Sequence, residues 1–256
     1  MLKKIILGIF LYQSCLLNAQ VIHINELDSL WRFKISATGL HIKGNSPKTL
    51  LTNKLKITKV NKNIGLICDY TYQYGTASAK KIVVYNDFRF ENTILLKPKN
   101  RFNPFVRTFT EKNIIRNIVF RHEVALGALQ KVISRKEHRL NFLLACVNQQ
   151  TNYKTASLNI AQYSSSKNLN TWKVMAGISG FNSLVKNKLR AEYRFYWMQA
   201  FENKQNFAYL IDITLEFILN NQISLLANYS KTYEYLEPKG ILPYEVQLTY
   251  GLSIKF

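Results

Sequence analysis

The segment 245–256 alternates strictly between polar and apolar residues, and this pattern constrains the fold more than any other feature of the sequence. Its apolar positions are Val246, Leu248, Tyr250, Leu252, Ile254 and Phe256. Side chains along a strand point alternately to opposite faces, so the segment is predicted to be a strand with one apolar and one polar face. Phe256 completes the apolar face. We therefore expect Tyr250, Leu252, Ile254 and Phe256 to form a C-terminal signal that the barrel assembly machinery reads.

The same two-residue period recurs in many other parts of the chain. It is present in the segments 31–36, 66–74, 189–197, 209–217 and 223–230, with Tyr or Trp near several of their ends. No stretch of 18 apolar residues occurs, so the sequence lacks the pattern of a membrane-spanning helix. Alternating segments of about ten residues are typical of transmembrane β-barrels, which close because lipid cannot pair with free backbone groups. We predict an all-β fold, a closed antiparallel transmembrane β-barrel in the bacterial outer membrane.

The number of strands follows from a count of candidate segments. They are 31–42, 49–60, 64–75, 81–96, 101–111, 115–129, 138–151, 155–165, 171–182, 188–200, 206–219, 222–235 and 244–256. A single-chain bacterial barrel has an even number of strands, with short periplasmic turns. The segment 155–165 is the weakest candidate, because a run rich in Ser and Asn follows it. Assigning 152–170 to an outer loop leaves twelve strands and makes Asn61–Asn63 and Asn220–Gln222 inner turns.

The N-terminal segment has the composition of a secretory signal. Two Lys residues precede the apolar run 5–11, and Ala19 offers a small residue before the cleavage point. A buried N-terminal helix and a lipoprotein anchored at Cys15 are the alternatives. We therefore expect residues 1–19 to be a signal peptide that directs export through the inner membrane, and 20–256 to be a single barrel domain.

Cysteine and histidine show no pattern of a metal or cofactor site, because there is no C-x-x-C and the four His are scattered. Cys68 and Cys146 lie in predicted strands and are interpreted as isolated thiols, with a disulfide as the alternative. The segment around His41 only faintly resembles the site of an outer-membrane phospholipase. His122 alternates with Phe120 and Val124, which places it on the membrane-facing side or at the membrane interface, and His138 lies in a turn. We predict that the protein is not an enzyme and has no cofactor.

Basic residues strongly outnumber acidic ones. The chain has 35 Lys and Arg against 15 Asp and Glu, a net charge of +20. Such a charge favours nucleic acid as the partner of a soluble protein, but no nucleic-acid-binding motif is present and exported barrels do not normally meet nucleic acid. We therefore expect outer-membrane lipids and lipopolysaccharide as partners, with compositional drift as the alternative explanation. The sequence does not indicate an oligomeric state.

The polar faces of the predicted strands carry charges of both signs, which are expected to line the lumen. The predicted lumen charge cluster consists of Arg121, Glu123, Arg190, Glu192, Arg194, Asp212 and Glu216. These charges are interpreted either as a selectivity lining or as salt bridges that plug a narrow barrel, and we predict the plug. In a plugged barrel the change Arg194→Ala is expected to lower the unfolding temperature, because it leaves buried carboxylates without a partner.

Several short motifs resemble the salt-induced outer-membrane protein family. They are Thr38-Gly39 through Asn45-Ser46, Tyr70-x-Tyr72-x-Tyr74-Gly75, Phe105-x-x-x-Phe109, Arg121-His122-Glu123-x-Ala125-Leu-Gly127-Ala128 and Glu237-Pro238-x-Gly240. The resemblance covers residues 31–256. It implies an outer-membrane barrel of largely unknown function with a suggested link to salt stress, and it implies no catalytic residues.

The sequence therefore predicts a non-enzymatic outer-membrane barrel with a charged, plugged lumen. Its expected role is structural or related to envelope or salt stress. A small-solute or ion channel is the first alternative, which conductance measurements would detect. A lipid-modifying barrel enzyme is the second alternative, which lipid analysis would detect.

Overall fold

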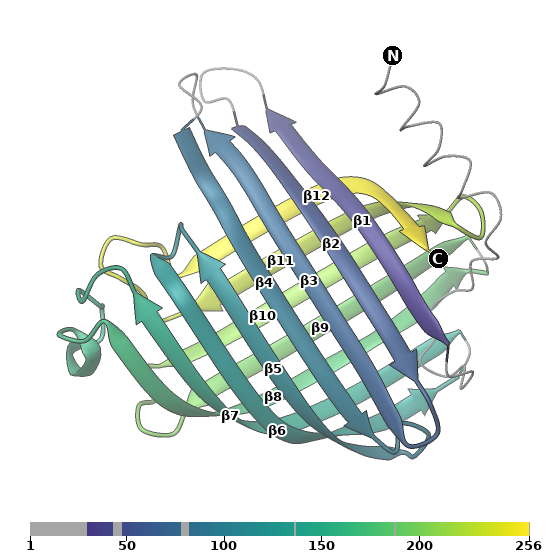
Figure 1. Ribbon diagram of the computed structural model, residues 1–256, viewed down its shortest axis with the longest axis horizontal. Coiled ribbons are helices and arrows are strands. Elements are labelled where there is room, and N and C mark those ends of the chain that lie inside the picture. The colour runs from purple at the N-terminus through teal and green to yellow at the C-terminus, as the bar shows by residue number, and fades with distance from the viewer. Residues whose placement is uncertain (1–29, 43–47, 78–81, 136, 187, 256) are drawn as a thin grey trace.

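The computed structural model describes residues 30–42, 48–77, 82–135, 137–186 and 188–255, which form a closed antiparallel barrel of twelve strands (Figure 1). The strands are β1 (Trp31–Ile42), β2 (Lys48–Val60), β3 (Ile64–Ala77), β4 (Ile82–Leu96), β5 (Phe102–Asn113), β6 (Ile118–Ser134), β7 (His138–Tyr153), β8 (Asn168–Val185), β9 (Leu189–Ala200), β10 (Phe207–Ile218), β11 (Ile223–Glu234) and β12 (Tyr244–Lys255). The predicted fold class is confirmed. The expected signal peptide and Phe256 lie outside the described residues.

The strands follow one another around the ring in sequence order, and β1 pairs with β12 to close it. Residues 154–167 connect β7 to β8 and contain one short 3₁₀ helix, η2 (Ala161–Tyr163). This segment is a loop, as the even strand count required. Among the described residues, no helix is long and apolar enough to cross a membrane.

The two ends of the barrel differ in the length of their connections. We call the end with the segments 114–117, 154–167, 201–206 and 235–243 the loop end. The opposite end, with the connections 61–63, 97–101 and 219–222, is the turn end, where β1 begins and β12 finishes. Outer-membrane barrels carry long loops outside and short turns in the periplasm, so the turn end is expected to face the periplasm.

Asparagine side chains stabilise two of the tight turns at the turn end. Asn61 Oδ1 accepts the backbone N–H groups of Asn63 and Ile64 at 2.9 and 2.7 Å. Asn220 Oδ1 accepts those of Gln222 and Ile223, both at 2.8 Å. In both turns the Asn side chain substitutes for a backbone acceptor, which explains why the chain reverses there within a few residues.

The seam between β1 and β12 is short. β1 pairs with β2 along its whole length, but with β12 only from Lys34 to Gly39, opposite Lys255 to Tyr250. Beyond Gly39 the two strands diverge (Figure 1). Within the seam the backbones approach closely, because a Cβ atom at Gly251 would overlap the Ala37 carbonyl oxygen.

Polarity divides the barrel wall into two faces. On β12, the side chains of Tyr250, Leu252 and Ile254 are exposed on the outside, whereas Ser253 and Lys255 are buried on the inside. Apolar side chains outside and polar ones inside are the arrangement that a strand needs between lipid and a polar lumen. On β12 the charged side chain of Lys255 therefore lies in the interior.

Candidate functional site

The lumen is the candidate functional site, because inward positions of several strands carry buried charged side chains. Arg121 and Glu123 lie two residues apart on β6, so both point inwards, and both are buried. The intervening His122 stacks on Phe120 with ring centroids 6.5 Å apart, and Phe120 is exposed on the outer face. Because side chains alternate along β6, its charged side chains point into the barrel and its aromatic rings point outwards.

A group of five charged residues occupies the lumen near the loop end. This loop-end cluster consists of Glu111, Arg116, Arg121, Glu234 and Glu237. Arg121 Nη1 lies 2.9 Å from Glu111 Oε1, and Arg121 Nη2 lies 2.8 Å from Glu234 Oε1. Because β6 and β11 are five positions apart in the ring of twelve, the Arg121–Glu234 ion pair crosses the lumen.

Arg116 connects this ion pair to the loop between β11 and β12. Its Nη2 atom lies 2.7 Å from Glu234 Oε2, and its guanidinium group also contacts Glu237 Oε1. Two carboxylates thus share one arginine. Burial raises the pKa of Glu237 to about 8; the positive charge of Arg116 opposes this rise and the negative charge of Glu234 adds to it.

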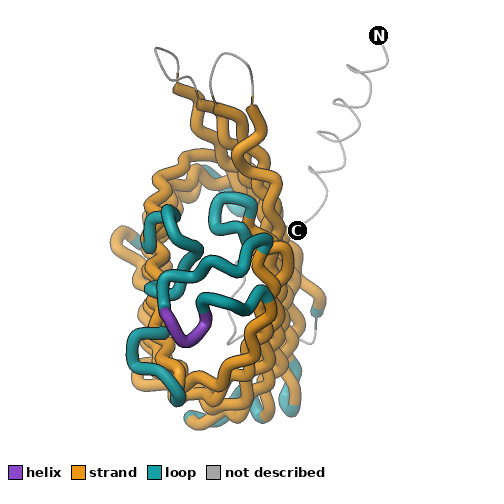
Figure 2. Tube along the Cα trace, turned by 90° about the vertical axis from the view of Figure 1, so that its left-hand side faces the viewer, coloured by secondary structure: helices purple, strands orange, loops and turns teal. Residues whose placement is uncertain are grey.

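Two loops fold over the loop-end cluster and cover it. Asn159 N donates to Glu237 O at 2.9 Å, and Lys239 N donates to Ser157 O at 2.8 Å, so the loops 154–167 and 235–243 pair like two short strands. Figure 2 shows loops and the 3₁₀ helix lying across the mouth of the barrel.

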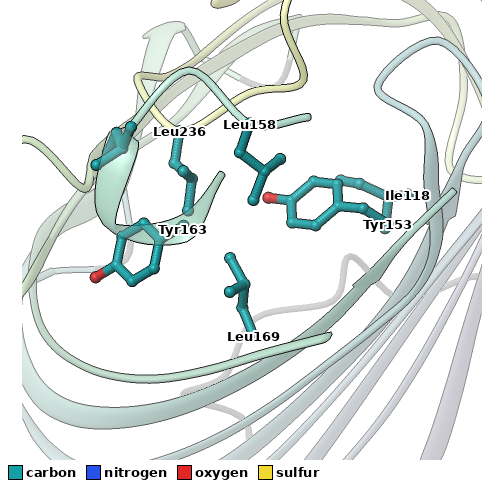
Figure 3. Close-up of a cluster of buried hydrophobic side chains, with 7 residues drawn as sticks. Ile118, Tyr153, Leu158, Tyr163, Leu169 and Leu236 are labelled. Atoms are coloured by element: carbon teal, nitrogen blue, oxygen red, sulfur yellow. The ribbon is translucent and has the colours of Figure 1, made fainter. Parts of the chain in front are cut away.

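The covering loops are fixed by an apolar cluster (Figure 3), which we call the roof. Its members are Ile118, Tyr153, Leu158, Ile160, Tyr163, Leu169 and Leu236. Leu158 is fully buried although it lies in a loop, and Leu236 reaches it from the neighbouring loop. Apolar burial of this kind keeps water away from the ion pairs beneath and strengthens their electrostatic interaction.

A second arginine connects strands in the middle of the barrel. Arg107 on β5 lies 3.1 Å from Glu91 Oε1 and 3.5 Å from Glu123 Oε2. Its Nη1 atom also lies 3.8 Å from the Met175 sulfur on β8, three strands away. Gln149 donates to the same Glu123 at 2.7 Å. The carboxylates of Glu91 and Glu123 and the donors of Arg107 and Gln149 are thus paired with one another inside the lumen.

A third group lies near the turn end around Glu216 of β10. This turn-end cluster consists of Lys34, Arg190, Glu216 and Lys255. Lys255 Nζ lies 2.6 Å from Glu216 Oε1, while Lys34 Nζ and Arg190 Nη1 lie 3.4 and 4.0 Å from Oε2. Three cations surround one fully buried carboxylate, so Glu216 holds β1, β9, β10 and β12 together.

The rest of the lumen is open. A cavity of about 860 Å³, which includes space open to solvent, lies between β2–β5 and β9–β12 in the loop-end half of the barrel. We call it the open cavity. Within it Arg194 Nη2 lies 3.6 Å from Asp212 Oδ2, and Asp69 Oδ2 lies 3.9 Å from Lys56 Nζ. The side chain of Arg194 is 38% exposed, against 5% for Arg121.

The model of one protein family matches residues 35–256, and its description reads "protein of unknown function, DUF481". The chain belongs to this family. A search of curated proteins found no match. The family model covers β2 to β12 completely and all of β1 except residues 31–34, so the clusters above lie almost entirely within the DUF481 region.

Solved structures share the barrel fold of this DUF481 protein. The NanC porin is 12% identical with a TM-score of 0.52, and the alignment covers 87% of this chain and 98% of that one. An outer membrane channel from Pseudomonas putida F1 is 9% identical with a TM-score of 0.48, covering 92% and 99%. The translocator domain of the autotransporter NalP from Neisseria meningitidis is 12% identical with a TM-score of 0.45, covering 99% and 95%. The barrel resembles bacterial outer-membrane proteins.

The structure brings some of the predicted lumen residues of this DUF481 protein together and separates others. Arg190 faces Glu216, and Arg194 faces Asp212, as neighbouring strands dictate. Arg121 and Glu123 belong to different groups, because Arg121 turns towards the loop end and Glu123 towards Arg107. Among the described residues, Glu192 makes no ion pair within 4 Å.

Sequence reasoning missed several charged residues of the lumen and its roof. Among them are Arg107, Glu111, Arg116, Lys173, Glu234 and Glu237. On β5 the signal is obscured because Phe105 and Phe109 point inwards beside Arg107, so the inner face is not uniformly polar. The Arg107 guanidinium lies 5.2 Å from the Phe109 ring centroid, a cation–π contact that makes an aromatic ring acceptable inside.

Other residues singled out from the sequence lie away from these clusters. Cys68 and Cys146 are free thiols on β3 and β7. Thr110 Oγ1 lies 3.1 Å from His122 Nδ1 on the outer face. Among the described residues no group of three His, Cys, Asp or Glu side chains could hold a metal ion. The segment 43–47, which carries part of the family resemblance, lies outside the described residues.

Proposed function

We propose that this protein is a non-enzymatic outer-membrane barrel with a plugged lumen and a structural role in the cell envelope. The observation that carries the proposal is the Arg121–Glu234 ion pair, which joins opposite walls of the barrel beneath the roof. Side chains that meet across the lumen narrow the path of a solute at that level. A link to salt stress stays a prediction from the family resemblance.

The plug is expected to be stable because its charges are dry and paired. The side chains of Arg121 and Glu234 are 5% and 4% exposed, and Glu234 accepts from both Arg116 and Arg121. Breaking a buried pair by removing one partner costs about 3–5 kcal/mol. Thermal motion alone would therefore open this level of the lumen rarely.

The outer surface supports an environment of membrane lipids. At the turn end the Lys59 ammonium lies 4.7 Å from the Trp31 ring centroid, a pairing suited to the boundary between headgroups and hydrocarbon. Exposed basic residues continue around this end at Lys97, Lys99 and Lys188. We expect these side chains to contact phospholipid headgroups on the periplasmic side. Contact with lipopolysaccharide at the loop end stays a prediction.

The non-enzymatic part of the proposal is supported by the surroundings of His122. Its contact with Thr110 resembles a nucleophile and its base, but catalysis also needs a group that orients the imidazole. The pair lies beside the exposed ring of Phe120, and no carboxylate of the described residues contacts His122. A hydroxyl in this setting is not activated for attack on a lipid ester.

Conductance in planar bilayers tests the proposal. The wild-type protein should show near-zero conductance. Leu158→Asp should raise it, because a charge in the roof would displace the loops from the mouth. The matched control is Ser165→Asp, an exposed position in the same loop, which should remain closed. Steady ionic current through the wild-type protein would refute the plug and favour an ion channel, for which the open cavity is the supporting observation.

A further inference from the structure

The lining of the open cavity holds six carboxylates and four cations, although the chain as a whole is strongly basic. Its charged lining residues are Lys54, Asp69, Asp87, Arg89, Glu91, Glu111, Lys112, Arg194, Asp212 and Glu245. Most of the carboxylates among them are neutralised: Asp212 by Arg194, Glu111 by Arg89 and Arg121, Glu91 by Arg107, and Asp69 by Lys56. Among the described residues, two carboxylates of the lining remain without an ion pair, Asp87 and Glu245, as do two cations, Lys54 and Lys112.

Asp87 and Glu245 make no ion pair within 4 Å with any of the described residues. Asp87 is only 5% exposed; its Oδ1 atom accepts the Ile114 N–H at 2.7 Å, and its Oδ2 atom has no hydrogen-bond partner in the described part of the chain. Glu245 Oε1 accepts the Tyr85 hydroxyl at 3.1 Å and Gln247 Nε2 at 2.7 Å. A buried carboxylate without a partner is costly, so its retention points to a ligand.

The two carboxylates face each other across the cavity. Tyr85 and Asp87 lie two residues apart on the same face of β4, and the Tyr85 hydroxyl reaches Glu245 on β12. Gln73, the register partner of Asp87, donates to Gln247 Oε1 at 2.8 Å, two residues from Glu245. These contacts bring the inner faces of β4 and β12 together at the level of both acids.

We propose that Asp87 and Glu245 bind the ammonium or guanidinium group of a small hydrophilic organic cation. Ionised carboxylates only accept hydrogen bonds, and charged N–H donors match them. The polar lining offers partners for hydroxyl or amide groups of the same ligand, from Thr52, Asn113 and Thr232. The Arg121–Glu234 ion pair lies outside the lining residues of the cavity, whereas Glu111 of the loop-end cluster is one of them.

Calorimetric titration of the purified barrel in detergent tests the site. N-methylglucamine, a polyhydroxylated ammonium ion, is the cationic probe, and sorbitol is its neutral counterpart. N-methylglucamine should bind to the wild-type protein and sorbitol should not. Asp87→Asn and Glu245→Gln should each weaken binding by about tenfold or more, because each removes a charge-assisted hydrogen bond.

Asp69→Asn is the matched control, since Asp69 lines the same cavity but is paired with Lys56. It should leave the affinity within about twofold. Heat-modifiable migration in SDS checks that each variant is a closed barrel, and the two independent variants allow for one that fails to fold. Equal binding of sorbitol, no binding of N-methylglucamine, or an equal loss in Asp69→Asn would overturn the proposal.

Discussion

The loop-end cluster and the open cavity contain the same kinds of residue, but the cluster is buried beneath the roof and the cavity is open to water. Arg121 meets Glu111 and Glu234 beneath the roof, with side chains at most 5% exposed. Arg194 meets Asp212 at 3.6 Å beside a cavity, with 38% of its side chain exposed. The contrast shows that a charged side chain can point into the barrel and still be exposed to water. Whether loops cover the charge determines how much its ion pair contributes to the free energy of unfolding.

The cause of the difference lies in the loops rather than the strands. The roof contains Leu158, Ile160 and Leu236 from two loops that pair over Arg116 and Glu237. No such cover is formed by the described residues over Asp212 and Arg194. Water screens charges strongly, so the two ion pairs are expected to respond very differently to the loss of one partner.

The largest effect is expected for Arg121→Ala. The change leaves Glu111 and Glu234 buried without their shared cation and should lower the free energy of unfolding by about 3–5 kcal/mol. Denaturant or thermal unfolding in detergent measures it. Adding Glu234→Gln should recover part of the loss, because the uncompensated charge is then removed. A loss below about 1 kcal/mol would show that water reaches this cluster.

A smaller, pH-dependent effect is expected from Glu237, whose pKa burial raises from 4.5 to about 8. Between these values the folded protein holds a proton that the unfolded chain releases, so stability should fall as pH rises, by up to about 1.4 kcal/mol per pH unit. Thermal unfolding from about pH 5 to about pH 8 measures the slope. Glu237→Gln should flatten it, whereas Glu202→Gln, an exposed carboxyl at the same end, should leave it unchanged. A slope that survives Glu237→Gln would assign the proton to another group.

The smallest effect is expected for Arg194→Ala. Sequence reasoning gave this arginine a structural weight, but its exposure reduces the expected loss of stability to about 1 kcal/mol or less. Arg194→Ala is still expected to lower the unfolding temperature, but by less than a change in a buried ion pair would. The same unfolding measurement as for Arg121→Ala applies. Equal losses in the two variants would remove the distinction between the covered and the open parts of the lumen.

Period-two alternation, together with the even strand number of bacterial barrels, was enough to predict the barrel, its strand count and a loop within 152–170, which the structure places at 154–167. It works because each strand separates lipid from a polar interior, so every second residue reports its face. It also predicted that Arg190, Glu192 and Arg194 lie on the same inward face of their strand. Register between neighbouring strands then explains the pairs with Asp212 and Glu216.

The loop-end cluster could not be predicted in the same way. Arg116 and Glu237 lie in connections, where no period applies, and the ion pair of Arg121 with Glu234 joins strands that are far apart in the ring. Contacts across a lumen depend on the cross-section of the barrel, which alternation does not encode. The aromatic residues inside β5 hid Arg107 and Glu111 for the related reason that a cation–π contact makes an apolar ring compatible with a polar interior.

The short seam between β1 and β12 has a consequence for the order in which the barrel folds and unfolds. These strands are the farthest apart in sequence, yet they share only six residues of ladder, whereas β1 and β2 share twelve. Bringing the distant ends of the chain together costs entropy before any of those hydrogen bonds form. A short ladder offsets little of this cost, because it contains few hydrogen bonds. We therefore expect the ring to be completed last at this seam. We also expect the barrel to open into a sheet at this seam first when it unfolds.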